Sequence, residues 1–131
     1  MLAITGKCRE ILAAVVLELQ SNRAVLFGLT NWFSVFVFTG GRVPTASWSL
    51  AATNSYLQRP PMADDATILD MQRYRSLVQA ISGIEDAGAG PRTLKCRRSV
   101  GNRFAAAASE LRLVADALEL SMKKVLEELK S

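Results

Sequence analysis

The sequence of residues 104–129 is FAAAASELRLVADALELSMKKVLEEL, and its apolar residues recur at alternating intervals of four and three. This spacing places them along one side of an α-helix, as in the heptad repeat of a coiled coil. A continuous apolar stripe of this length is unfavourable in water, so it predicts a long helix that packs against other helices. The stripe, which we call the seam, consists of Phe104, Ala108, Leu111, Ala115, Leu118, Met122, Val125 and Leu129.

Two further leucines, Leu113 and Leu120, lie on the opposite side of the same predicted helix. They are one heptad apart, and Ala106 is in line with them. A simple two-stranded coiled coil would leave both leucines in water. Their position therefore favours a bundle, or a helix held between two neighbours.

A second helix is predicted over residues 66–86, before the seam. Asp64 and Asp65 can cap its beginning, and the glycines and proline of residues 87–91 end it. Residues 62–131 are therefore predicted to form an α-helical hairpin, or a coiled-coil or bundle module. The apolar stripe of the second helix consists of Ile68, Met71, Tyr74, Leu77, Val78, Ile81 and Ile84.

Residues 1–61 have a different character, and Pro60-Pro61 marks the predicted boundary because a proline pair cannot continue a helix. Residues 7–20 predict a short helix that Ser21-Asn22 interrupts. Residues 41–61 are rich in small polar residues and predict a linker. The mainly α chain is therefore expected to begin with an irregular, poorly defined hydrophobic extension, and residues 62–131 are expected to fold without it.

Residues 24–41, AVLFGLTNWFSVFVFTGG, carry no charge and lie between Arg23 and Arg42. Eighteen apolar residues are the lower limit for a helix that crosses a bilayer. However, Asn31 would be costly in lipid, and the aromatic and β-branched residues 33–38 also suit a buried strand. The sequence leaves a membrane segment and a buried segment both open.

The composition excludes several kinds of site. There is no histidine, so a serine–histidine triad and the commonest transition-metal ligand are absent. Cys8 and Cys96 cannot form a structural zinc site alone, and they favour free thiols in a reducing intracellular compartment. We expect no enzyme activity, no cofactor and no metal.

A basic cluster precedes the seam and could contact phosphates of a nucleic acid or an anionic lipid surface. It lacks interleaved aromatic residues for base stacking, and the net charge of the chain is only +4, so nucleic acid is the less favoured partner. The cluster consists of Arg92, Lys95, Arg97, Arg98 and Arg103.

Three functional hypotheses follow. The first is a non-enzymatic protein–protein interaction module, a small subunit of a multiprotein complex that binds helices of the same or another protein through the seam. It predicts that Leu118→Asp abolishes association and that Glu110→Ala does not. The second is a small membrane-anchored protein with residues 24–41 in the membrane and the helical half as a docking stalk. The third is a nucleic-acid accessory factor that uses the basic cluster.

Overall fold

The computed structural model describes residues 2–39, 48–58, 65–87 and 93–130. These residues form four helices: α1 (Leu2–Thr39), α2 (Ala51–Gln58), α3 (Asp65–Ala87) and α4 (Leu94–Lys130). No described residue belongs to a strand. The mainly α fold expected from the sequence is confirmed.

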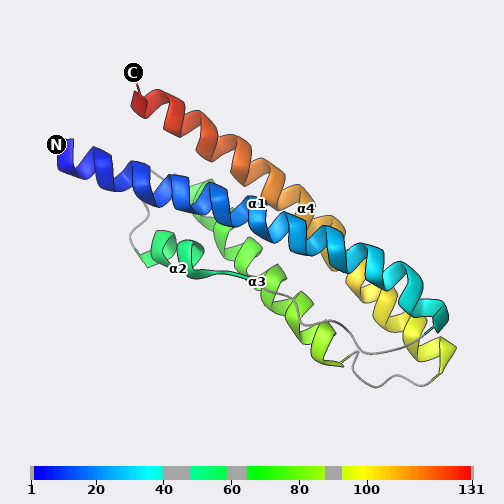
Figure 1. The fold of residues 1–131 in the computed structure, drawn as a ribbon. Coiled ribbons are helices and arrows are strands. Elements are labelled where there is room, and N and C mark those ends of the chain that lie inside the picture. Colours follow the sequence, from blue (N-terminus) through cyan, green and yellow to red (C-terminus); the bar gives the residue numbers. More distant parts are fainter. Residues whose placement is uncertain (1, 40–47, 59–64, 88–92, 131) are drawn as a thin grey trace.

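The two longest helices, α1 and α4, run side by side in opposite directions (Figure 1). Helix α3 packs against another side of α4, and the short α2 contacts both α1 and α3. Side chains from α1, α2, α3 and α4 share one hydrophobic core. The seam of α4 faces this core.

Helix α1 corrects the expectation of an irregular N-terminal extension, since residues 2–39 form one helix of 38 residues. Its buried residues follow the same alternating intervals of three and four as the seam, so α1 presents a second heptad stripe to the core. We call this stripe the α1 stripe. It consists of Leu12, Val15, Leu19, Asn22, Leu26, Leu29, Phe33 and Phe36, all of them buried.

Two local features that disfavoured a continuous helix are compensated by distant partners. Asn22, expected to interrupt the helix, is buried and forms hydrogen bonds with residues 49 and 74. Phe33, expected to suit a strand, stacks on Phe104 of α4 with 4.2 Å between ring centroids. Tertiary packing therefore outweighs the local preference of both residues.

Helix α3 agrees closely with the sequence analysis, and α4 contains the expected helix of residues 104–129 but begins at Leu94, ten residues earlier. Helix α3 spans Asp65–Ala87 against the expected 66–86, and it buries Met71, Tyr74, Val78 and Ile81. Thr93 directly precedes α4, and its hydroxyl accepts a hydrogen bond from the Cys96 amide at 3.2 Å. Such a bond satisfies one of the free N–H groups of the first turn.

The expected linker at residues 41–61 contains helix α2, which the sequence analysis did not predict. Pro60, Pro61 and Asp64 lie outside the described residues, and so does the turn expected at residues 88–91.

Candidate functional site

The seam lies mainly inside the molecule. Val125 is partly buried, and the side chain of Leu129 is outside the described part. The remaining six residues are buried in the chain's own core: Phe104, Ala108, Leu111, Ala115, Leu118 and Met122. The helices that cover them belong to the same chain, since α4 packs against α1 and α3.

The opposite side of α4 faces solvent. Leu113 and Leu120 are 72% and 73% exposed. Ala106 and Ala117 lie on the same side and are also exposed. We call these four residues the outer face of α4. These side chains of α4 are exposed to solvent and do not take part in the core.

A cluster of polar residues lies where α1 meets the beginning of α2. Glu18 is 8% exposed, and its carboxylate accepts hydrogen bonds from the backbone amides of Ala52 and Thr53 at 2.8 and 3.0 Å. The hydroxyls of Ser49 and Thr53 donate to the same carboxylate at 3.0 and 2.6 Å. Leu50, at the capping position of α2, has no polar side chain, so Glu18 of another helix satisfies the free amides instead.

Asn22, one turn further along α1, joins three segments of the chain. Its side-chain amide donates to the Ser49 carbonyl and to the Tyr74 hydroxyl, both at 2.7 Å. Its oxygen accepts from the Ser49 amide at 3.0 Å. Glu18 and Asn22 together fix α2 to α1, and Asn22 connects both to α3.

The chemistry of this cluster is structural. Both oxygens of Glu18 accept two hydrogen bonds each, so the carboxylate is occupied by its own chain. Burial raises the pKa of Tyr74 to about 12, the hydrogen bond from Asn22 opposes the rise, and the charge of Glu18 adds to it. Tyr74 therefore stays neutral at physiological pH. No group of acidic or cysteine side chains among the described residues has the arrangement of a metal site.

The sequence analysis missed this cluster because its hydrogen bonds join residues 27 to 52 positions apart. A local sequence pattern does not show which residues so far apart in sequence are in contact. The available signal was the α1 stripe, whose regular spacing continues through Asn22 and places that residue among buried positions.

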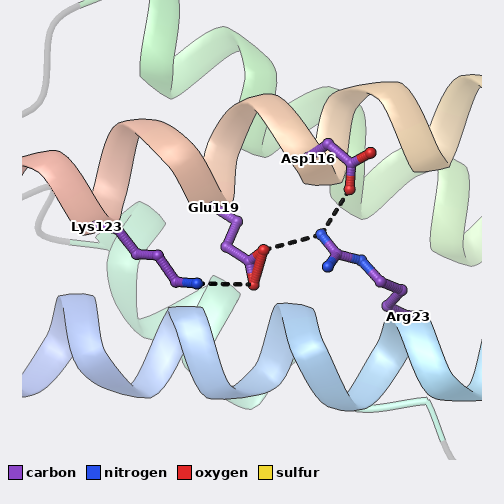
Figure 2. Close-up of polar contacts among 4 residues, drawn as sticks. All are labelled: Arg23, Asp116, Glu119 and Lys123. Atoms are coloured by element: carbon purple, nitrogen blue, oxygen red, sulfur yellow. Dashed lines mark hydrogen bonds and ion pairs between the residues drawn. The ribbon is translucent and has the colours of Figure 1, made fainter.

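A second polar group connects α1 to α4 at the surface (Figure 2). The guanidinium of Arg23 contacts the carboxylates of Asp116 and Glu119 at 2.6 and 3.0 Å, and Lys123 contacts Glu119 at 3.8 Å. Burial raises the pKa of Glu119, but hydrogen bonds from Gln20 and Arg23 and the two cationic charges outweigh it, so the pKa lies below its usual value of 4.5. On the α3 side of α4, Arg73 forms an ion pair with Glu110.

The basic cluster lies in the first turns of α4. Lys95, Arg98 and Arg103 are exposed, and Arg97 is partly buried. Arg92 lies outside the described residues. Both cysteines are free thiols; Cys96 is exposed and Cys8 is partly buried.

Within α1, the stretch Cys8–Phe36 is long and apolar enough to cross a membrane, judged by length and composition alone. About 39% of its most apolar part is buried inside the molecule. No family model matches the sequence, and neither a curated protein nor a solved structure shows significant similarity to it.

Proposed function

We propose that this protein is a non-enzymatic α-helical interaction module, a small subunit of a larger assembly, which binds a helix of another protein through the outer face of α4. The observation that carries the proposal is the exposure of Leu113 and Leu120, nearly three quarters each, one heptad apart on a long regular helix. Ala117 lies between them at helical spacing. A partner helix could approach closely there, because alanine leaves room for its side chains.

The energetics favour this use of the surface. Covering a fully exposed leucine contributes about 2 kcal/mol. Two exposed charged residues of α4, Lys124 and Glu127, follow Leu120 at helical spacing and can select a partner by charge. Because the seam holds α4 against α1 and α3, the outer face is presented by a rigid helix, which reduces the entropy lost on binding.

The non-enzymatic part of the proposal rests on the side chains available. The chain has no histidine, and the buried carboxylate of Glu18 is occupied by four donors of its own chain.

The experiment compares partner binding after substitution of two exposed leucines, one on the outer face and one on α3. Leu120→Asp in the full-length chain should remove the bound partner in a co-purification and leave the melting temperature unchanged, because the side chain is already in water. Leu69→Asp is the matched control, since Leu69 is similarly exposed on α3. Equal partner recovery with both variants and with the unaltered chain would show that the outer face is not the binding surface.

The structure changes which substitution is informative. Leu118→Asp, which the seam suggested, would place a carboxylate at a position that is 1% exposed. That variant would destabilise the fold itself. Leu120 tests binding separately from folding.

A membrane anchor is the second candidate function, supported by the length and apolar character of α1. It ranks second because the predicted membrane segment, residues 24–41, contributes four buried side chains to the molecule's own core: Leu26, Leu29, Phe33 and Phe36. Insertion of this segment into a bilayer would remove these side chains from the core. If this alternative is correct, the protein should stay in the membrane fraction after extraction with alkaline carbonate.

A further inference from the structure

One end of the molecule combines two stretches without acidic residues. The sequence has no acidic residue between Glu18 and Asp64, and none between Asp86 and Glu110. The last turns of α1 and the first turns of α4 come from these stretches and lie side by side (Figure 1), as the stacking of Phe33 on Phe104 shows. We call the surface formed by residues 27–39 of α1 and 94–112 of α4 the basic end; its one acidic residue, Glu110, forms an ion pair with Arg73 of α3.

A groove runs between the two helices at the basic end and has a volume of about 420 Å³. Phe33 and Phe104 contribute aromatic side chains to its lining. Small residues keep it open, and Arg112 also lines it. The small residues are Thr30 and Ser34 of α1 and Gly101, Ala105, Ala108 and Ser109 of α4.

Helical spacing places two exposed phenylalanines, Phe27 and Phe38, on the groove side of α1. Phe27 lies one turn before Thr30, and Phe38 lies one turn after Ser34. Phe27 is 67% exposed and Phe38 is 74% exposed. The two phenylalanines lie about three turns apart on the same side of α1, where helical spacing places them together. Large apolar side chains this exposed are candidates for contact with an apolar or interfacial partner.

Cations border the groove on α4. Arg98 precedes Gly101 by three residues and Ala105 by seven, so helical spacing places it on the groove side, as it does Leu94 four residues earlier. Lys95 and Arg98 are exposed, and neither forms an ion pair within the described residues. The nearest acid beyond Arg112 on this side is Asp116, which Arg23 neutralises at 2.6 Å.

We propose that the basic end docks peripherally on an anionic lipid surface, a partner different from the protein helix assigned to the outer face. Phe27 and Phe38 enter the headgroup region, while Arg98 and Arg112 contact lipid phosphates. The combination of exposed aromatic side chains with cations, in stretches that hold almost no acids, matches the surface of an interfacial membrane-binding helix. The arginines stay in the aqueous headgroup layer, so no charge enters the hydrocarbon.

A lipid surface fits better than a nucleic acid. Phosphate recognition on nucleic acids is dominated by cations and by polar contacts, and single strands add aromatic stacking within a basic groove. Here Phe27 and Phe38 lie outside the lining of the groove and are exposed to solvent, and Arg112 is the one cation among the described residues that line it.

The test is co-sedimentation of the purified full-length chain with vesicles. Vesicles that contain phosphatidylserine in phosphatidylcholine should bind the protein, and vesicles of phosphatidylcholine alone should bind it far more weakly. Raised salt should release it, because the interaction is electrostatic in part. Arg98→Glu should reduce the affinity for the anionic vesicles by roughly tenfold or more, and Phe38→Ser should also reduce it.

Two control variants test whether a loss of vesicle binding is specific to the basic end. Lys124→Glu makes the same charge change on an exposed residue at the other end of α4, and Leu113→Ser removes an equally exposed apolar side chain from the outer face. Neither should alter vesicle binding. All four residues are exposed, and circular dichroism should confirm an unchanged helical fold in each variant.

Several results would overturn the proposal. These are equal binding to neutral and anionic vesicles, no binding to either, or equal losses in the control and test variants. Binding that resists alkaline carbonate would indicate a spanning helix instead. Binding of an RNA or DNA oligonucleotide in the absence of vesicle binding would indicate a nucleic-acid partner. Loss of the protein partner in Leu120→Asp leaves this test unaffected, because the two surfaces are separate.

Discussion

Glu18 holds the beginning of α2 through four hydrogen bonds, and a change to glutamine tests that role. The glutamine side chain would keep one acceptor oxygen and direct an NH₂ group either at the donors of Ser49 and Ala52 or at those of Thr53. We expect Glu18→Gln to lower the free energy of unfolding by about 2 kcal/mol, measured by urea denaturation. Glu10→Gln is the control, because Glu10 is exposed two turns earlier on α1. Equal stability of both variants would contradict the capping role.

Glu119 makes the stability of the fold depend on pH. Its pKa is lower in the folded chain than in the unfolded chain, so it stabilises the fold above the usual carboxyl pKa of 4.5, and this contribution is lost as the pH falls through the lower value. Glu119→Gln should therefore lower stability at neutral pH and flatten the loss of stability below about pH 5. The measurement is the free energy of unfolding across that range. Glu127→Gln, an exposed change on the same helix, should leave the profile unaltered.

Among the elements, α3 and the C-terminal part of α4 were predictable because local signals agree there. Their apolar spacing is regular, and the residues around it favour helix. The first helix was harder. Ser21-Asn22 and the aromatic run at residues 33–38 carry local preferences against helix, and the contacts that override them involve Tyr74 and Phe104, far away in sequence.

The polar cluster and α2 were harder still to predict from the sequence. Helix α2 is eight residues long and has an apolar capping residue, Leu50. Its first turn depends on the carboxylate of Glu18, more than thirty residues earlier. A short helix of this kind is marginal alone. Its presence follows from the tertiary structure, which a local pattern does not contain.

For the whole molecule, the sequence analysis expected residues 62–131 to fold alone. The shared core argues against this expectation, because α1 contributes to it. Without α1, the seam residues that α1 covers would face water. We therefore expect the fragment to keep helical content but to self-associate and lose cooperative thermal unfolding. Light scattering and a thermal melt by circular dichroism measure both properties. A monomeric fragment with a sharp transition would show that the hairpin is independent.

Asn22 has a consequence for how precisely the two long helices are aligned. Two heptad stripes can match again after one helix slips by seven residues, since apolar side chains would still meet apolar side chains. Asn22 is the one polar member of the α1 stripe, and its partners are Ser49, before α2, and Tyr74 of α3. If α1 slipped along α4 while α3 stayed packed on α4, Asn22 would leave Tyr74, and its buried amide would lose this partner at a cost of about 1–3 kcal/mol. A leucine there would tolerate the slipped pairing as well as the correct one, so the asparagine gives up some apolar contact in exchange for a unique alignment.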